Sequence, residues 1–191
     1  NLIGFCNILE NCKTQKINHF IFASSSSVYG GETKFPYKES YSSADRPIQL
    51  YAATKRSNEI LAYSYSHLYK MKITGLRFFT VYGPWGRPDM AIFKFTKKIL
   101  ENKSIEIYNR GDHYRDFTYI DDIVDGIIKS SKRKNCVNKK LNTNLEILNI
   151  GCGAPSKLMY CINLIEKHLG KTAKKKFLSM QKGDMHKTFA S

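Results

Sequence analysis

Residues 19–25 read HFIFASS, a short run of isoleucine and phenylalanine that ends in two serines. Apolar runs of this length are typical of strands that are buried on both faces of a parallel sheet. A second run of the same kind, KITGLRFFTVYG, occupies residues 72–83, and a helical pattern at 51–70 separates the two. Two strands joined by a helix predict a βαβ unit, in which the strands run parallel.

The alternation of strand and helix patterns continues along the chain. Further strands are predicted at residues 104–109 and 145–151. The spacing of apolar residues predicts helices at 1–13, 51–70, 90–102, 119–131 and 156–170. Thr118 or Asp116 is a candidate N-cap for the helix at 119–131, and Gly170 is a stop signal for the last helix. This order predicts an α/β fold with a doubly wound parallel sheet.

The chain is strongly basic, with 31 lysines and arginines against 16 aspartates and glutamates and a formal net charge of +15. Much of the excess lies in two segments, residues 129–140 and 167–176, which resemble solvated helix ends or loops. No helix-turn-helix, zinc-finger or RNA-recognition signature accompanies the charge. We therefore expect no nucleic-acid partner, although a basic binding module without enzyme activity remains an alternative. An anionic small substrate would need only a few of these residues.

The five cysteines are odd in number and contain no C-x-x-C pair, so the spacing expected of metal ligands is absent. They are Cys6, Cys12, Cys136, Cys152 and Cys161. Cys6, Cys12 and Cys161 lie in apolar, helical patterns and are predicted to be core thiols. This usage favours a reducing, cytoplasmic location. No run of about 18 apolar residues indicates a membrane-spanning helix.

The stretch GCGAPS at residues 151–156 follows a predicted strand and precedes a predicted helix, as a dinucleotide-binding fingerprint would. Its third glycine position is Ser156, and Pro155 precedes it, so the fingerprint is incomplete. We interpret the stretch as a tight strand-to-helix turn. We therefore expect this chain to lack the glycine-rich cradle for a nucleotide phosphate.

Ser25, Tyr51 and Lys55 could together handle a proton. A tyrosine phenol normally loses its proton at a pKa of about 10. Lys55 follows Tyr51 by four residues, so it lies on the same helical face and can stabilise the phenolate. A serine at the end of a neighbouring strand can hold a substrate hydroxyl beside the phenol. Each residue alone also has an ordinary structural explanation in packing, a loop or a helix surface.

Four blocks in order carry a resemblance to a known family: FIFASSSSVYG (20–30), YAATK (51–55), LRFFTVYGP (76–84) and RDFTYIDDI (115–123). This pattern resembles the extended short-chain dehydrogenases/reductases that act on nucleotide sugars, the NAD-dependent epimerase/dehydratase family. The resemblance covers essentially the whole chain. It is strongest to the UDP-glucuronate 4-epimerases within that family.

The resemblance implies the C-terminal part of a Rossmann-like sheet together with a small substrate-binding subdomain. Residues 1–88 would be the C-terminal portion of the NAD-binding Rossmann domain. Residues 89–191 would be mainly a nucleotide-sugar-binding region, with the segment at about 116–152 returning to the sheet. We expect the glycine-rich half to lie upstream of Asn1, so the chain would be a fragment. NAD is the implied cofactor, and the choice between NAD and NADP would depend on that upstream segment.

The resemblance also implies roles for individual residues. Tyr51 would be the general base and acid at the sugar C4 hydroxyl. Lys55 would lower the pKa of Tyr51 and bind the nicotinamide ribose. Ser25 would hydrogen-bond the reacting oxygen, and Ser26 is the alternative because the register within the serine run is open.

Further binding residues follow from the same resemblance. Phe79 and Val81 would approach the nicotinamide, Thr80 the sugar, Met90 to Ile92 and Tyr108 the uridine, and Arg115 the diphosphate. Simple core packing is the alternative for Phe79 and Tyr108. A surface salt bridge with Asp112 or Asp116 is the alternative for Arg115.

Two features narrow the implied reaction. Related dehydratases and decarboxylases carry acidic residues in the serine segment, where this chain has Ser26 and Ser27, so epimerisation is favoured over water elimination. Arg87 could grip a sugar carboxylate bidentately and hold it out of alignment for decarboxylation. The implied reaction is the conversion of UDP-glucuronate to UDP-galacturonate through a 4-keto intermediate. Another nucleotide-sugar epimerase or reductase is the alternative, and a homodimer paired through two long helices, including 51–70, is expected.

Overall fold

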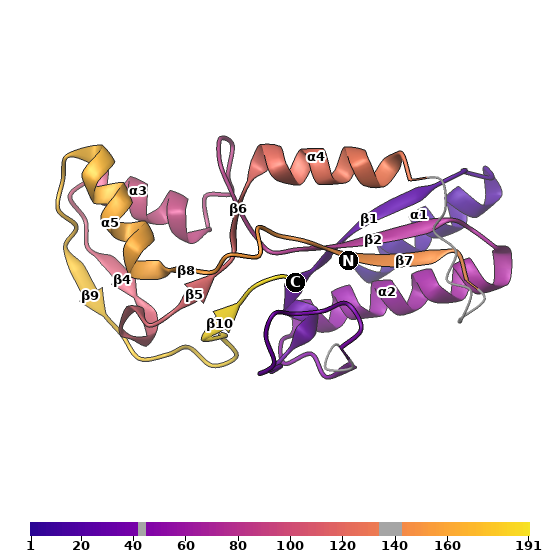
Figure 1. Cartoon of the computed structure of the whole chain (residues 1–191), viewed down its shortest axis with the longest axis horizontal. Helices are drawn as coiled ribbons and strands as arrows, with labels where there is room; N and C mark the ends of the chain where they lie inside the picture. Colours follow the sequence, from indigo (N-terminus) through magenta and orange to yellow (C-terminus); the bar gives the residue numbers. More distant parts are fainter. Residues whose placement is uncertain (42–44, 134–142) are drawn as a thin grey trace.

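The computed structural model describes residues 1–41, 45–133 and 143–191. The molecule is elongated, and its helices and strands gather at two ends (Figure 1). One end contains a three-stranded parallel sheet between helices, and the other contains two further helices beside a pair of short strands. The predicted α/β class with a parallel sheet is confirmed.

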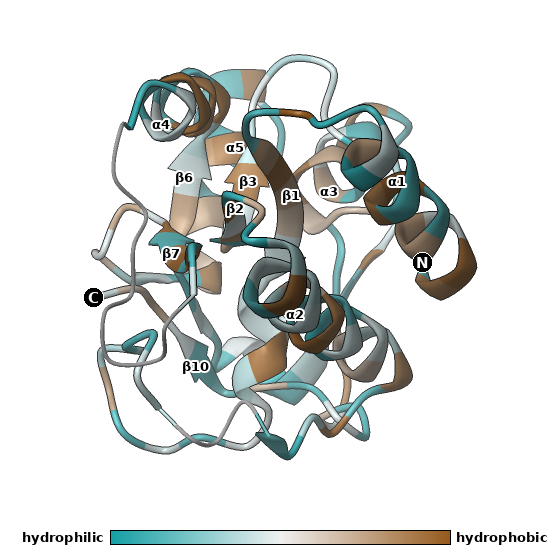
Figure 2. Cartoon of the chain, turned by 90° about the vertical axis from the view of Figure 1, so that its right-hand side faces the viewer, coloured by the Kyte–Doolittle hydropathy of each residue, from teal (hydrophilic) through white to brown (hydrophobic). Residues whose placement is uncertain are grey.

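The larger sheet consists of β1 (Phe20–Ser25), β2 (Ile73–Phe78) and β7 (Leu145–Ile150) in the order β1-β2-β7, all parallel. The central strand β2 is the most deeply buried because it has a neighbour on each side and helices over both faces. Helices α1 (Leu2–Thr14) and α2 (Leu50–Tyr69) lie on one side of the sheet and α4 (Ile120–Ser131) on the other (Figures 1 and 2).

The core beneath α1 and α2 is aromatic and aliphatic. It contains Phe5, Leu9, Phe22, Ala62, Met71 and Ile73. Phe5 contacts Phe22 edge to face, with ring centroids 5.0 Å apart. Gly75 in β2 allows this packing, because a Cβ there would lie 2.7 Å from both Phe22 and Ile147.

The run at residues 72–83 forms two strands in different sheets, so the prediction of one strand was wrong. β2 ends at Phe78, and β3 (Thr80–Tyr82) pairs instead with β6 (Phe117–Tyr119) in parallel. The chain changes partner at Phe79, whose N–H donates to the Ile150 carbonyl at 3.1 Å. The next N–H, that of Thr80, donates to the Asp116 carbonyl at 3.1 Å. Both strands contain apolar residues, so the hydrophobic pattern alone does not reveal which neighbouring strand each of them pairs with.

The other end of the molecule is built from α3 (Ala91–Leu100), β4 (Ile105–Ile107), α5 (Leu158–Leu169) and β9 (Lys175–Phe177). The short strands β4 and β9 run parallel. The apolar faces of the two helices meet over a separate core of Phe95, Ile99, Ile105, Ile107, Leu158, Ile162 and Ala173. Gly170 ends α5 with a left-handed φ of 62°, which confirms the predicted stop signal.

Short elements connect the two ends. β5 (Tyr114–Arg115) is the middle strand of a small sheet, with β10 (Lys187–Thr188) parallel on one side and β8 (Ser156–Lys157) antiparallel on the other. Two 3-10 turns, η1 (Ser26–Tyr29) and η3 (Tyr108–Gly111), follow β1 and β4 directly. The predicted strand at 104–109 is therefore shorter than expected. The predicted helix at 156–170 begins two residues late, after β8.

The predicted N-cap of α4 was wrong. The helix begins after Tyr119, and no side chain caps it. Thr118 and Asp116 are buried and bond to each other, with the Thr118 hydroxyl donating to Asp116 Oδ1 at 3.0 Å. Asp121 and Asp122 in the first turn supply the negative charge that a helix N-terminus favours.

The stretch at residues 151–156 forms a turn, but the turn joins β7 to β8 and not directly to a helix as predicted, because α5 begins only after β8. Gly153 has a φ of 75°, which suits glycine. The cysteine predictions were partly wrong: Cys6, Cys12 and Cys161 are only half-buried, and Cys136 lies outside the described residues. Over the ranges described above, no helix is both long enough and apolar enough to cross a bilayer.

Candidate active site

Ser25 lies at the carboxyl end of β1, where parallel sheets commonly hold ligands. It is the last extended residue before η1, with φ −155° and ψ 147°. Its Oγ accepts hydrogen bonds from the Ser27 N–H at 3.2 Å and from the Ser27 hydroxyl at 2.9 Å. Because Ser27 donates to it, the hydroxyl hydrogen of Ser25 remains free to donate to a ligand.

Tyr51 and Lys55 lie in the first two turns of α2, which packs against β1. Lys55 Nζ donates to the Ala23 carbonyl at 2.8 Å and lies 5.9 Å from the centre of the Tyr51 ring. The side chain of Tyr51 is about half exposed (49%). Burial lowers the pKa of Lys55. The structure therefore brings the lysine of this helical pair to the strand that ends in Ser25.

Sequence reasoning missed a buried polar cluster behind these residues. The carboxylate of Glu59, which follows Lys55 by one turn, bonds to Ser24 in β1, Arg77 in β2 and Arg56 in α2. Burial alone would raise the pKa of Glu59, but the two arginines and the serine lower it overall. Two sequence features could have revealed this cluster: an acidic residue four positions after Lys55, and an arginine inside an otherwise apolar strand.

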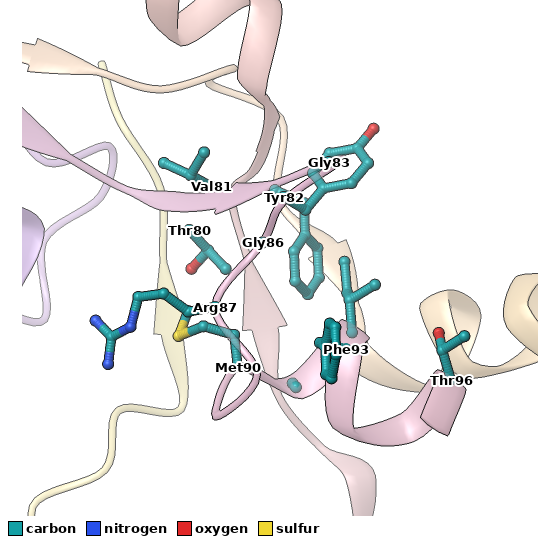
Figure 3. Close-up of a pocket in the computed structure, with 12 residues that line it drawn as sticks. Thr80, Val81, Tyr82, Gly83, Gly86, Arg87, Met90, Phe93 and Thr96 are labelled. Atoms are coloured by element: carbon teal, nitrogen blue, oxygen red, sulfur yellow. The ribbon is translucent and has the colours of Figure 1, made fainter. Parts of the chain in front are cut away.

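Three adjoining cavities lie along β3, and Met90 lines all of them. The first, of about 220 Å³, lies between β3 and the start of α3 and is drawn in Figure 3. Thr80, Arg87 and Met90 lie together on one side of it, and Phe93 and Thr96 of α3 lie on the other (Figure 3).

The other two cavities contain the remaining predicted binding residues. One, of about 310 Å³, is lined by Phe79, Val81 and Arg87 as well as Met90. The other, of about 210 Å³, is lined by Thr80, Tyr108 and Arg115 as well as Met90. Every predicted binding residue other than those of the serine run and the Tyr–Lys pair therefore lines at least one of these cavities. Ser25, Ser26, Tyr51 and Lys55 are not among the residues that line these three cavities.

Arg87 shows how its guanidinium can hold a carboxylate. It is exposed and forms a two-pronged ion pair with Asp89, in which Nε donates to Oδ1 at 3.0 Å and Nη2 contacts Oδ2. The hydrogen bond from Arg87 lowers the pKa of Asp89. A ligand carboxylate would therefore have to compete with Asp89 for the same donors.

Arg115 is paired with a residue distant in sequence. Its Nη2 donates to Asp184 Oδ1 at 2.8 Å, so the predicted alternative partners Asp112 and Asp116 were wrong. Burial lowers the pKa of Arg115, and Asp184 opposes that shift. His113 Nε2 lies 3.4 Å from the other oxygen of Asp184. Two basic side chains therefore share one carboxylate, and a ligand anion would have to compete with Asp184 for Arg115.

Phe79 is buried, and its side chain packs with Tyr37, Tyr29, Val28 and Ala190 in a third core cluster. Its ring lies 6.3 Å from that of Tyr37. The ring therefore has the packing role that the sequence left as an alternative. Phe79 also borders the 310 Å³ cavity.

A model of the NAD dependent epimerase/dehydratase family matches residues 1–151. The chain belongs to this family, as its motifs predicted. Among its relatives, an uncharacterised protein of Methanocaldococcus jannaschii is 54% identical over 190 residues, which cover 100% of this chain and 56% of that protein. A probable UDP-glucuronate 4-epimerase of Rhizobium meliloti is 46% identical over 202 residues, covering 100% of this chain and 59% of that protein.

A solved structure of similar fold supports this assignment to the family. The UDP-glucuronic acid 4-epimerase from Bacillus cereus, in complex with UDP-glucuronic acid and NAD, superposes with a TM-score of 0.87 at 35% identity. The superposition covers 100% of this chain and 58% of that one, and it confirms the Rossmann-like fold class. The chain thus spans less than two thirds of the length of each of these proteins.

Proposed function

We propose that the gene product carrying this chain is an NAD-dependent UDP-sugar 4-epimerase that interconverts UDP-glucuronate and UDP-galacturonate. The observation that carries this proposal is the bond from Lys55 to the Ala23 carbonyl, which joins the Tyr51–Lys55 pair to the strand end of Ser25. Likeness to the epimerases of Rhizobium meliloti and Bacillus cereus supports the substrate.

The residues of this chain suit a proton transfer at the sugar C4 hydroxyl. Tyr51 as phenolate removes the hydroxyl proton and later returns it, while Ser25 donates a hydrogen bond to the same oxygen. Lys55 stabilises the phenolate by its charge. Bound NAD would supply the acceptor and donor for the C4 hydride. Between the two transfers, the planar 4-keto sugar must present its other face, which requires space next to Tyr51.

The residues also fit NAD and a UDP-uronate. The 310 Å³ cavity bordered by Phe79 and Val81 has an apolar lining and lies beyond the carboxyl ends of parallel strands, as expected for a nicotinamide ring. The alternative serine is Ser26, which lies beside Ser25 in η1.

We assign the sugar nucleotide to the cavities around Met90. Thr80 would contact the sugar, Met90 to Ile92 and Tyr108 the uridine, Arg115 the diphosphate, and Arg87 the carboxylate. A diphosphate near Arg115 would take the place of Asp184 as the partner of its guanidinium.

We further propose the division expected from the sequence. Residues 1–88 would complete an NAD-binding domain, and 89–191 would form mainly the nucleotide-sugar-binding region. β7 is the edge strand next to β2 in the larger sheet. This position supports the expectation that the segment at about 116–152 returns to the Rossmann sheet.

A homodimer is supported by apolar residues exposed on α1 and α2. They include Leu2, Ile3, Ile8, Leu50, Ile60 and Leu68, and brown segments of both helices are visible in Figure 2. Free thiols at Cys6, Cys12, Cys152 and Cys161 suit a reducing cytoplasm.

The direct test is an assay of the purified gene product on UDP-glucuronate, UDP-glucose and UDP-xylose, followed by NMR of the sugar. We expect conversion of UDP-glucuronate to UDP-galacturonate, with less turnover of the other two. Turnover of UDP-glucose or UDP-xylose alone would favour another epimerase of the family. Salt-sensitive binding to nucleic acid without affinity for UDP-sugars would favour a basic binding module.

Substituting Arg87 tests the carboxylate contact. Arg87→Ala is expected to raise the KM for UDP-glucuronate about tenfold, the effect of losing one charge-assisted contact. We also expect a larger share of decarboxylated product, measured by NMR, because the carboxylate can then align with the 4-keto group. Arg133→Ala, which removes an exposed arginine paired with Glu146, is the matched control. An unchanged KM together with unchanged product ratios would rule out this role.

A further inference from the structure

The carboxylate of Glu59 is the most densely bonded buried charge on the helix that carries Tyr51. Only 2% of the residue is exposed. Its Oε1 accepts from the Ser24 hydroxyl at 2.6 Å and from Arg77 Nε at 2.8 Å. Its Oε2 accepts from Arg77 Nη2 and from Arg56 Nη1, both at 2.8 Å. Both oxygens are therefore fixed in direction by charge-assisted or short hydrogen bonds.

These partners join α2 and β1, which carry the proposed proton machinery, to the central strand β2. Ser24 directly precedes Ser25 in β1, and its neighbour across the sheet is Arg77 in β2. Tyr51, Lys55 and Glu59 follow one another at intervals of four and so lie along one side of α2. The bond from Lys55 to the Ala23 carbonyl runs beside that from Ser24 to Glu59. The helix is thus bonded to the strand at two successive residues, immediately before the serine.

The cluster extends across the whole sheet. The Arg77 guanidinium lies 4.7 Å from the centre of the Tyr29 ring, and the Tyr29 hydroxyl donates to Asn149 Oδ1 in β7 at 2.7 Å. A buried ion pair is seldom needed for stability, because apolar side chains of similar volume stabilise a core equally well. Directional bonds add something that apolar packing lacks, since they fix how far the helix is rotated and shifted relative to the strand.

We propose that Glu59 is a positioning residue that holds Tyr51 and Lys55 at a fixed place relative to Ser25. This inference rests on the proposed epimerase function. Glu59 itself touches no reacting atom. It acts through Ser24 and Arg77, and its loss allows α2 to shift against the end of β1. A displacement of about 1 Å at reacting groups is enough to cost roughly 100-fold in rate.

The test compares two variants of the gene product. Glu59→Leu combined with Arg77→Met removes both members of the fully buried ion pair, and Arg56, which is partly exposed, keeps its ion pair with Asp45. We therefore expect the double variant to fold with a Tm close to that of the wild type. We expect kcat to fall roughly 100-fold with KM within about threefold. We also expect the acidic limb of the kcat profile to move to higher pH, because a displaced lysine stabilises the phenolate less. Ser24→Ala breaks only the link to β1 and is expected to lower kcat about five- to tenfold, with the same direction of pH shift.

Glu166→Leu combined with Lys175→Met is the matched control, because it removes an ion pair of similar length (2.6 Å) between α5 and β9, outside the site. We expect it to leave kcat and the pH profile unchanged. If both Ser24→Ala and the Glu59–Arg77 double variant fold and keep the wild-type kcat and pH profile, the inference is overturned. Equal losses in the control also overturn it, since they indicate general destabilisation. If the double variant does not fold, Ser24→Ala alone decides. A wild-type gene product without epimerase activity would instead refute the proposed function on which the inference depends.

Discussion

Replacing Tyr51 with phenylalanine in the gene product is expected to lower kcat about 10³-fold. The substitution removes only the phenolic oxygen, and loss of a general acid–base group typically costs about 10²–10⁴ in rate. The fold should not change, because the Tyr51 side chain is about half exposed and no hydrogen bond from its hydroxyl stabilises the described structure. NMR of UDP-galacturonate formation from UDP-glucuronate measures the rate, and circular dichroism checks the fold.

Tyr160→Phe is the matched control, since Tyr160 is a similarly exposed tyrosine on α5, outside the site. Its kcat should equal that of the wild type. Lys55→Met should lower kcat in the same direction as Tyr51→Phe, because the phenolate loses its stabilising charge. If Tyr51→Phe retains more than a tenth of the wild-type kcat, Tyr51 is not the proton-transfer group.

The parts of the site that the sequence could predict are those set by local periodicity. Lys55 is the fourth residue after Tyr51, so a helix places them on one face without any tertiary information. The strand at β1 was predictable because a short apolar run ended by serines suits a buried parallel strand. The parallel pairing of β1 with β2 then followed from the βαβ rule.

The parts that could not be predicted depend on partners far away in the chain. Arg115 pairs with Asp184, 69 residues later, and no local pattern distinguishes that acid from Asp112 or Asp116. The exchange of strand partner at Phe79 is set by hydrogen bonds to Ile150 and by the following contact with Asp116. Propensity and periodicity describe a segment by itself, so they cannot rank its tertiary partners.

Asp116 shows most clearly what a local interpretation misses. The sequence indicated Asp116 as a candidate N-cap, but the residue is completely buried. It links its own segment to the turn after β7 and to the chain near Ala190. Its Oδ1 accepts from the Cys152 N–H at 2.8 Å, and its Oδ2 accepts from the Gly153 N–H at 2.9 Å and the Ala190 N–H at 3.0 Å. The carboxylate therefore serves as the hydrogen-bond partner of three backbone donors, two in the turn after β7 and one near Ser191.

Asp116→Ala is accordingly expected to lower the free energy of unfolding by about 3–5 kcal/mol. Each buried N–H left without an acceptor costs about 1–3 kcal/mol, and water entering the space would recover part of the sum. Guanidinium unfolding followed by circular dichroism measures the change. Asp125→Ala, which removes an exposed acid paired with Lys129 on α4, should change stability by no more than about 0.5 kcal/mol. A loss below about 1 kcal/mol for Asp116→Ala would show that the turn after β7 and the chain near Ala190 are held by other contacts. A large loss would show that this carboxylate holds the turn after β7 and the chain near Ala190 together.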